Sequence, residues 1–348
     1  MTQSNPQQRL RVGAHFIDLA DYPSEAIADL VRLAQHLEQK PEPRALVGKI
    51  LGLLFLNPSL RTLASMQAAM FRLGGQAFVI TPGQGSWGLE SRPHVRMDGA
   101  AAEHIREGLP VLSGYCDALG IRAFAHGEDL NADVSDAAFL AMAKLIPAQP
   151  VINLESAINH PCQALADWKT LEDLQVPRHS KFVLSWVPHP KPLPLAVPAA
   201  VLTMAAQRGH EVVIARPEGF ALPEPIMAKA RQLAERAGGS VRECADPMTA
   251  YADAHIIYAK EWGTTSAYGD AEHYHTCVST LRHWQITEQS FSHSLPQARL
   301  LHCLPVRRNV AVDERVLDGP RSSVIAQAHN RLWAQMAVLH RVLGQRFT

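Results

Sequence analysis

Short aliphatic and β-branched runs recur along this 348-residue chain, and segments with helical apolar spacing separate most of them. Four runs precede residue 155, namely KILGLLFL, QAFVI, ALGIRAF and PVINL. From Lys181 onward come KFVLSWV, EVVIARP, HIIYAK, RLLHCL and SSVIAQ. Segments such as HIREGLPVLSGYC and EPIMAKARQLAERAG place apolar residues three and four apart. Short strands that alternate with amphipathic helices predict an α/β fold with parallel sheets.

The length and the spacing of the runs predict two domains, because 348 residues are many for one hydrophobic core. We expect two doubly wound parallel-sheet domains joined by helices, over residues 1–155 and 156–329. The helical HPCQALADWKTLEDL and the polar QVPRHS lie between the two sets of runs and mark the hinge region. The last amphipathic segment, about residues 330–348, is expected to pack back on the first domain.

The charge balance argues against nucleic acid or membrane partners. Lysine and arginine total 33, as do aspartate and glutamate, so no overall field attracts a polyanion. The five cysteines are odd in number and lack Cys-x-x-Cys spacing, which is typical of reduced thiols. The first residues, MTQSNPQQRL, contain no apolar signal core, and LVGKILGLLFL is about half a membrane span. We therefore expect a soluble, cytoplasmic protein.

The segment FLNPSLRTLASMQ predicts an anion site at a strand-to-helix turn that contains no glycine. The strand would end at Leu56, with Asn57 as the helix cap and Pro58 in the first helical position. The positive end of the helix dipole would then face an anion such as phosphate. An ordinary capped helix with a surface arginine remains the alternative. The groups facing the anion would be the N–H groups of Ser59, Leu60 and Arg61, the Ser59 and Thr62 hydroxyls, and the Arg61 guanidinium.

A second motif, TPGQGSWG, matches the glycine spacing of a dinucleotide fingerprint at Gly83, Gly85 and Gly88. That fingerprint needs a helix after the glycines, whereas Trp87 and the irregular LESRPHVRMDG follow here. We favour a mobile glycine-rich loop that presents Trp87. A dehydrogenase remains an alternative that a nicotinamide binding test would decide.

Polar residues also follow other predicted strands, at the ends where open α/β sheets bind ligands. Glu155 ends PVINL, and NHPCQ follows. Pro161 would open a helix with His160 as its cap, so the imidazole is expected to be neutral and able to donate one hydrogen bond. Gln163 lies about one turn further on. A histidine before proline is also a common cap without a catalytic role.

The run RLLHCLPVRR places Cys303 after another strand and ahead of Arg307 and Arg308. Nearby cations would lower the pKa of the thiol, whereas a structural cysteine would simply be a small buried hydrophobe. We expect no metal site, since the loose group within EHYHTC has strand-like alternation and no further ligands. That group consists of His273, His275 and Cys277.

Taken together, NPSLRT, HPCQ and HCLP resemble the carbamoyltransferases, which join carbamoyl phosphate to an amine. YAKEWG lacks the Ser-Met-Gly element of the ornithine carbamoyltransferases. Instead WVPHPKPLPLAVP, YAKEWG, HCLPVRRNV and the Trp87 loop resemble the N-acetylornithine and N-succinylornithine carbamoyltransferases of arginine biosynthesis. The resemblance implies a deep knot in the second domain, involving about residues 186–198. It also implies a homotrimer in which Trp87 reaches the neighbouring active site.

The resemblance also implies the reaction and its residues. Carbamoyl phosphate and an N-acylornithine would react directly through a tetrahedral intermediate, without metal, cofactor or covalent enzyme intermediate. The catalytic residues implied are Arg61, Arg122, His160, Gln163 and Cys303. Carbamoyl phosphate would contact Ser59, Leu60, Arg61, Thr62, Trp87, Arg122, His160, Pro161, Cys162, Gln163, Cys303, Leu304 and Arg331, the last at the start of the final helix. The acylornithine would contact Glu155, Lys260, Ala102 and Arg307.

Three positions depart from the family pattern. Leu63 stands where relatives carry a second arginine, and it shares an apolar helix face with Met66 and Met70, so we expect it to be buried. A paralogue that binds an anion without turnover is therefore an alternative function. Ala102 replaces a glutamate that excludes negatively charged acyl groups, and Ala311 replaces a lysine. Both alanines favour a succinyl over an acetyl group and leave other acyl groups open.

Overall fold

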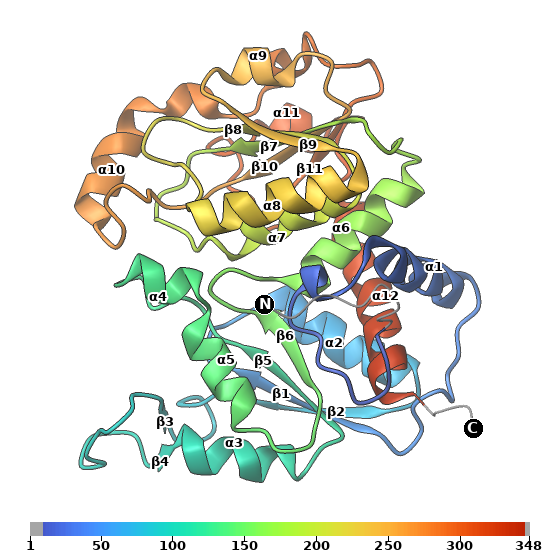
Figure 1. Cartoon of the computed structure of the whole chain (residues 1–348), viewed down its shortest axis with the longest axis vertical. Helices are drawn as coiled ribbons and strands as arrows, with labels where there is room; N and C mark the ends of the chain where they lie inside the picture. Colours follow the sequence, from blue (N-terminus) through green and yellow to red (C-terminus); the bar gives the residue numbers. More distant parts are fainter. Residues whose placement is uncertain (1–9, 345–348) are drawn as a thin grey trace. The chain divides into compact units, whose positions relative to one another are not determined.

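The computed structural model describes residues 10–344 and divides into two compact units (Figure 1). Helices α6 (Pro161–Asp173) and α12 (Val324–Leu343) each contribute to both units. The first unit holds the described residues up to Ala125, Asp136–Cys162, and those from Arg331; the second holds His126–Ser135 and Gln163–Asn330.

The first unit is built on a four-stranded parallel sheet in the order β2-β1-β5-β6. Its central strands are buried along almost their whole length, because helices cover both faces of a parallel sheet. The predicted α/β class and its parallel sheets are confirmed. The strands are β1 (Ile50–Phe55), β2 (Gln76–Ile80), β5 (Ala118–Arg122) and β6 (Val151–Glu155).

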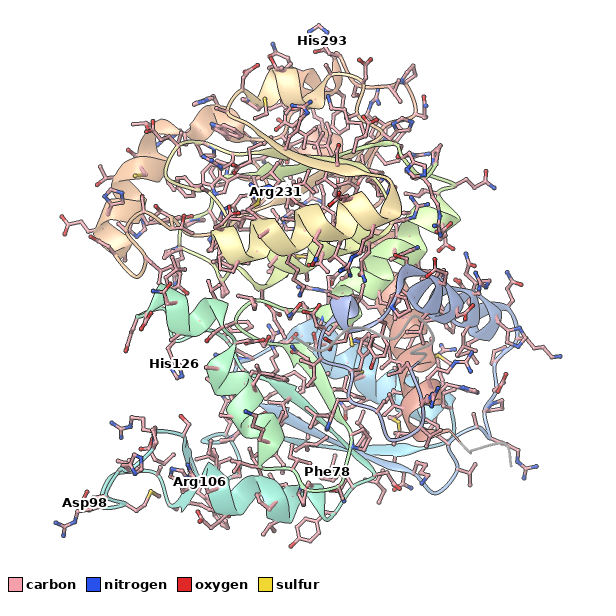
Figure 2. All side chains as sticks on the ribbon, in the orientation of Figure 1. Phe78, Asp98, Arg106, His126, Arg231 and His293 are labelled. Atoms are coloured by element: carbon pink, nitrogen blue, oxygen red, sulfur yellow. The ribbon has the colours of Figure 1, made fainter. Side chains whose placement is uncertain are left out.

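Helices cover both faces of this sheet. Buried residues of α3 (Ile105–Ser113) and α5 (Ala137–Lys144) pack with β1 and β5 in one apolar cluster. On the other side lie α1 (Ser24–Gln39), α2 (Leu60–Arg72) and the later part of α12 (Figure 1). The unit also contains η1 (Leu19–Asp21), β3 (Leu89–Glu90) and β4 (Glu103–His104); Asp98 projects from the loop between these strands (Figure 2).

The second unit has a five-stranded parallel sheet in the order β11-β10-β7-β8-β9. Every residue of α7 is buried, because this helix packs between the sheet and α8. The strands are β7 (Lys181–Trp186), β8 (Glu211–Ala215), β9 (Ser240–Cys244), β10 (Ile256–Lys260) and β11 (Arg299–Leu301). The helices are α4 (Leu130–Val134), α7 (Ala196–Gln207), α8 (Glu224–Ala237), α9 (Pro247–Tyr251), α10 (Ala271–Thr280), α11 (Glu314–Leu317), η2 (Arg282–Trp284) and η3 (Glu288–Phe291).

Three local predictions fail in the second unit. SSVIAQ is no strand, because α12 begins at Val324 within it. The missed strand β9 has a polar sequence, SVREC, because it lies at the sheet edge and stays largely outside the core. His273, His275 and Cys277 lie on helix α10 rather than on a strand. Among residues 10–344, no group of three or more histidine, cysteine or acidic side chains could hold a metal ion. Across the same residues, no helix combines the length and apolar character that a membrane span requires.

Candidate active site

The amino terminus of α2 forms the first element of the candidate site. The helix begins at Leu60 and its cap is Ser59, whose hydroxyl accepts a hydrogen bond from the Thr62 N–H at 3.2 Å. The prediction that Asn57 is the cap is wrong. The Asn57 side chain instead accepts from the Phe124 N–H at 2.8 Å and ties the ends of β1 and β5 together. The helix therefore begins two residues later than expected, at Leu60 rather than Pro58, and the N–H groups of Leu60 and Arg61 open its positive end.

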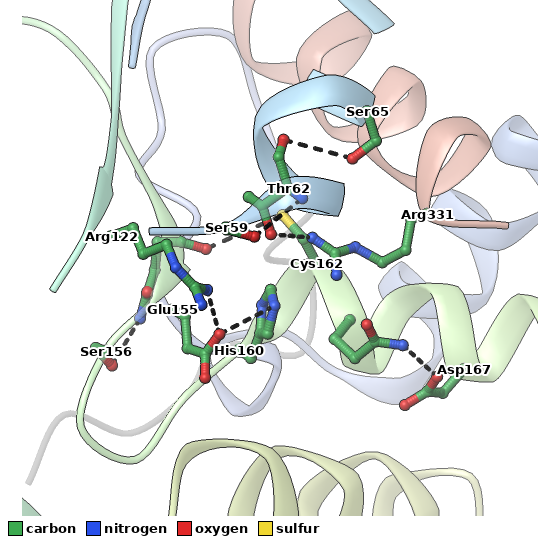
Figure 3. Close-up of polar contacts among 12 residues, drawn as sticks. Ser59, Thr62, Ser65, Arg122, Glu155, Ser156, His160, Cys162, Asp167 and Arg331 are labelled. Atoms are coloured by element: carbon green, nitrogen blue, oxygen red, sulfur yellow. Dashed lines mark hydrogen bonds and ion pairs between the residues drawn. The ribbon is translucent and has the colours of Figure 1, made fainter. Parts of the chain in front are cut away.

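Arg331 completes this helix terminus from α12. Its side chain is buried, and Nη2 donates to the Thr62 hydroxyl at 2.8 Å (Figure 3). The expectation that Arg331 opens the final helix is wrong, because α12 already begins at Val324. Because its side chain is buried, Arg331 is not a surface charge either. Its guanidinium is 3% exposed and stands at the amino terminus of α2, where its positive charge adds to the positive end of the helix dipole.

Arg122 and Glu155 form a buried ion pair at the ends of β5 and β6. Arg122 Nη1 donates to Glu155 Oε2, and Figure 3 shows the contact beside His160. The Nε atom of Arg122 has no hydrogen-bond partner among the described residues. A buried polar atom without a partner costs free energy unless a ligand satisfies it. Arg122 is therefore suited to bind a ligand oxygen while Glu155 holds it in place.

His160 lies immediately before α6 and is neutral. Burial, together with the charges of Arg331, Arg122 and Arg61, holds the pKa of His160 well below its usual value. The predicted neutral state is confirmed, although its causes are burial and three guanidiniums rather than the helix terminus. The ring does not cap α6, because Nδ1 has no partner and Nε2 lies 3.5 Å from Glu155 Oε2.

One prediction beside His160 is confirmed, and one about helix α2 is wrong. Pro161 is the first residue of α6, as its sequence position predicts. Burial raises the pKa of Cys162 to about 12, so this thiol stays protonated near neutral pH. Leu63 is only partly buried, contrary to expectation, since it lies at the margin of the apolar face that contains Met66 and Met70.

A buried polar network surrounds Gln163 in the second unit. Asp167 lies one turn later on α6 and accepts from Gln163 Nε2 at 2.8 Å. The same carboxylate accepts from Gln327 Nε2 at 2.7 Å and from the Tyr258 hydroxyl at 3.0 Å. The bond to Asp167 fixes which end of the Gln163 amide is the nitrogen, so Oε1 is the end that can accept from a ligand.

The carboxyl ends of β10 and β11 carry a second buried cluster. Lys260 ends β10, and its ammonium lies 3.5 Å from the carboxylate of Glu261. His302 follows β11, and its Nε2 lies 3.0 Å from Glu261 Oε2. Cys303 and Leu304 come next in the chain, and the backbone N–H of Leu304 donates to His302 Nδ1 at 2.9 Å. The cluster thus joins Lys260 to the turn that contains HCLP.

The two arginines after HCLP have different surroundings. Arg307 Nε donates to His189 Nε2 at 3.3 Å, and the Tyr274 hydroxyl donates to the His189 carbonyl at 3.0 Å. These contacts hold Arg307 against the proline-rich segment 186–198. Arg308 forms an exposed bidentate pair with Asp318. Because Arg308 is engaged there, Arg307 is the better candidate for contact with a ligand.

The remaining predicted positions lie on loops. Trp87 is 62% exposed, and its Nε1 donates to Glu103 Oε2 at 2.7 Å. No helix follows the preceding glycines, which excludes the dinucleotide fingerprint and agrees with the predicted loop. Ala102 is exposed beside Glu103, whereas Ala311 is fully buried in the second unit.

The sequence interpretation assigned no role to four buried residues, Asp167, Glu261, His302 and Gln327. Asp167 could have been found, since it lies four residues after Gln163 on one helix face. Glu261 and His302 stand inside YAKEWG and HCLP, where their neighbours drew attention instead. Gln327 lies far from both in sequence, and only the tertiary structure brings it to Asp167.

Comparison with known proteins places these two units in one family. Residues 14–173 match the aspartate/ornithine carbamoyltransferase, carbamoyl-P binding domain, and residues 197–342 match its Asp/Orn binding domain. The chain belongs to the aspartate/ornithine carbamoyltransferase family. It is 36% identical to the N-acetylornithine carbamoyltransferase of Xanthomonas campestris pv. campestris, over 95% of this chain and 98% of that protein. It is also 36% identical to the N-succinylornithine carbamoyltransferase of Bacteroides fragilis, over 85% of this chain and 87% of that protein.

Solved structures of the family agree. An acetylornithine transcarbamylase complexed with acetylcitrulline matches with a TM-score of 0.90 and 36% identity, covering 95% of this chain and 99% of that chain. A mutant N-acetyl-L-ornithine transcarbamylase complexed with carbamyl phosphate and N-succinyl-L-norvaline matches with a TM-score of 0.89 and 36% identity, covering 94% and 98%. The resemblance stated from sequence motifs is confirmed, and a carbamoyltransferase is a transferase enzyme.

Proposed function

We propose that this carbamoyltransferase moves the carbamoyl group of carbamoyl phosphate to the δ-amine of an N-acylated ornithine. The products would be the N-acylcitrulline and phosphate, as in arginine biosynthesis. The observation that carries the proposal is the cationic cluster at His160, where the buried Arg122 and Arg331 and the partly buried Arg61 lie near a neutral imidazole. Three guanidiniums beside a helix amino terminus would attract a small dianion, and relatives of the chain are named for acylated ornithine.

The phosphate of carbamoyl phosphate would be held by the first unit. The amino terminus of α2 offers backbone N–H groups, and Arg61 and Arg331 add fixed positive charge. Arg122 would bridge the phosphate and the carbamoyl oxygen. The contacts expected for the phosphate end are Ser59, Leu60, Arg61, Thr62, Arg122 and Arg331, with Pro161 and Cys162 beside them and Trp87 from a neighbouring subunit.

The carbamoyl group would be oriented by several polar groups that the family resemblance implies. His160 and Arg122 would stabilise the negative oxygen that develops when the carbonyl carbon becomes tetrahedral. Gln163 Oε1 and the carbonyls of Cys303 and Leu304 would accept hydrogen bonds from the carbamoyl NH₂. Catalysis would then rest on position and electrostatics, with Arg61, Arg122, His160, Gln163 and the Cys303 carbonyl in the catalytic set.

The reaction would proceed in two steps. An amine with a pKa near 10 in water must first lose a proton before its lone pair can attack the carbonyl carbon. Attack forms the new C–N bond, and collapse of the tetrahedral intermediate breaks the C–O bond to phosphate. The departing phosphate takes the electron pair of that bond, and the nitrogen loses its second proton. Neither step requires a covalent bond to the enzyme, in keeping with a protonated Cys162.

The acylornithine would contact the second unit and neighbouring loops. Lys260 would bind a carboxylate, with Arg307 as a second cation and Glu155 near the amine. Ala102 carries no charge that would repel a succinyl carboxylate, so N-succinylornithine is the favoured substrate. We further propose a cytoplasmic homotrimer with shared sites and, in the second domain, the deep knot that the family resemblance implies at about residues 186–198. We assign the first domain to carbamoyl phosphate and the second to acylornithine.

The decisive experiment offers carbamoyl phosphate with ornithine, N-acetylornithine or N-succinylornithine and measures the ureido product. Turnover of one acylated amine alone supports the proposal and names the substrate. Turnover of free ornithine contradicts the substrate assignment. Carbamoyl phosphate binding without turnover of any of the three amines would instead support a paralogue impaired at Leu63, and restored turnover in Leu63→Arg would identify that residue as the cause.

A further inference from the structure

His302 uses both of its ring nitrogens inside the second unit. The ring is fully buried, Nδ1 accepts from the Leu304 N–H at 2.9 Å, and Nε2 lies 3.0 Å from Glu261 Oε2. A backbone N–H can only donate, so Nδ1 carries no hydrogen. The ring hydrogen therefore sits on Nε2 and points at Glu261. His302 is a neutral imidazole in one defined tautomer.

Glu261 holds that tautomer in place. Its carboxylate is 1% exposed and lies 3.5 Å from the Lys260 ammonium. Burial opposes ionisation of Glu261, but Lys260 and the hydrogen bond from His302 outweigh it and keep the pKa of Glu261 well below its usual value. An ionised carboxylate accepts hydrogen bonds and donates none. The opposite tautomer of His302 would face this carboxylate with a lone pair and is disfavoured.

The hydrogen bond to Leu304 also determines where the Cys303 carbonyl points. The Leu304 N–H and the Cys303 C=O belong to the same planar trans peptide group, in which they point in opposite directions. When His302 holds the N–H, the carbonyl must face away from the imidazole. The His302 N–H is itself bonded to Gln327 Oε1 at 2.8 Å, so side chains hold both ends of the short segment. Leu304 has a φ of 56°, a left-handed conformation that needs such support.

We propose that His302, oriented by Glu261, is a positioning residue that aims the Cys303 carbonyl at the NH₂ group of the carbamoyl substrate. The inference rests on the proposed function, which assigns that NH₂ group to the Cys303 and Leu304 carbonyls. The inference adds His302 and Glu261, which would act on the substrate only through the backbone carbonyl of Cys303. Binding of the carbamoyl end of carbamoyl phosphate would depend on these two residues. Inorganic phosphate has no carbamoyl end, so its binding would not depend on them.

Two substitutions distinguish the hydrogen bond of His302 Nδ1 from that of Nε2. In His302→Asn the amide oxygen stands near the former Nδ1 and can still accept from Leu304, but the side chain is too short for Glu261. In His302→Gln the amide nitrogen can reach Glu261, but no acceptor replaces Nδ1. Calorimetry on the full-length chain would measure the Kd of carbamoyl phosphate and of inorganic phosphate for both variants.

We expect His302→Gln to weaken carbamoyl phosphate binding about tenfold, since one well-placed hydrogen bond is lost. Phosphate affinity should change less than about twofold, and His302→Asn should keep carbamoyl phosphate affinity within about threefold. Unchanged carbamoyl phosphate affinity in His302→Gln, or equal losses for both ligands in both variants, would overturn the positioning role. If the wild type transfers carbamoyl groups and His302→Gln binds carbamoyl phosphate with unchanged affinity, only this inference is refuted. Failure of the wild type to bind carbamoyl phosphate refutes the proposed function as well.

A spectroscopic measurement covers the case in which the variants do not fold. The ¹⁵N chemical shifts of His302 in the wild-type protein distinguish the two neutral tautomers and the imidazolium. We expect the Nε2–H tautomer, with coupling between the Leu304 amide and Nδ1. An Nδ1–H tautomer or a charged ring would exclude the proposed hydrogen bond.

Discussion

Arg331 Nη2 donates to Thr62 Oγ1 at 2.8 Å, which joins the final helix to the first turn of α2 across 269 residues of sequence. Both side chains are buried. The bond therefore adds a fixed guanidinium to the positive end of a helix dipole, and the two act on an anion in the same direction. Two distant segments thus build the proposed anion site within the first unit.

Replacing Arg331 by methionine tests this site while keeping most of the side-chain volume. We expect kcat/KM for carbamoyl transfer to fall about 10²–10³-fold, since one oriented charge at the reacting group is lost. Thr62→Val removes only the acceptor that positions the guanidinium and should cost about tenfold. Steady-state kinetics with varied carbamoyl phosphate would measure both. Arg341→Met, at an exposed position of the same helix, is the control, and an equal loss there would argue against a local role for Arg331.

The neutral state of His160 leads to a pH prediction. Its pKa is held well below the usual value by burial and by Arg331, Arg122 and Arg61. The imidazole should therefore remain neutral through the pH range around 6.5 in which a histidine in an unfolded chain titrates. NMR of the His160 ring at successive pH values would show constant shifts. A titration near pH 6.5 in the folded protein would contradict the cationic cluster at His160.

Strand ends were predictable because they depend on local sequence. Arg122, Glu155 and Lys260 each end a strand, as the apolar runs before them predict. Such runs identify two parallel sheets, and each sheet brings the carboxyl ends of its own strands to one edge. The family motifs then fall at these ends. Local pattern and sheet geometry were enough to predict this part of the candidate site.

Other features depend on contacts between distant segments, which local pattern does not contain. Asn57 is a good cap by type, but the Phe124 N–H binds it, and Ser59 caps the helix instead. SSVIAQ has the composition of a strand, yet it opens a helix whose Gln327 bonds to Asp167. In both cases a tertiary hydrogen bond accompanies the departure from local preference. The partners of Arg331 and His302 could not be predicted for the same reason.

The buried His210 gives a prediction about stability. Burial, with Arg208 next, lowers the pKa of His210 to about 3, and Arg208 Nη1 lies 2.8 Å from its Nε2. Because the pKa is lower in the folded than in the unfolded state, the unfolded chain binds more protons below about pH 6.5. The contribution of neutral His210 is complete above that pH and declines as the pH falls toward 3.

Chemical denaturation at pH 7 and pH 5 would measure the effect of His210. The unfolding free energy should be about 2 kcal/mol lower at pH 5 through this group, at about 1.4 kcal/mol per pH unit below 6.5. His210→Gln should reduce the difference between the two pH values by that amount, whatever its own effect at pH 7. His293→Gln, at an exposed position, is the control and should retain the wild-type difference. An unchanged difference in His210→Gln would show that other groups govern the acid sensitivity.

The exposed Trp87 provides a test of shared active sites. Its indole is 62% exposed and its described hydrogen bond is to Glu103, so Trp87→Ala should change the unfolding free energy by less than about 0.5 kcal/mol. If the indole completes a neighbouring site, kcat/KM should nevertheless fall at least about tenfold. Met97→Ala, in the same exposed segment, is the control for a general effect on the loop.

Mixed oligomers then decide whether the contribution of Trp87 crosses between subunits. Trp87→Ala and Arg331→Met chains would be unfolded together, refolded at equal amounts and assayed for carbamoyl transfer. When Trp87 acts on a neighbour, some mixed oligomers contain a site with Trp87 from one chain and Arg331 from another, and activity exceeds that of either variant alone. When Trp87 acts within its own chain, every site carries one defect and no activity returns. Light scattering on the same samples would give the oligomer mass, and a monomer would exclude the proposed trimer.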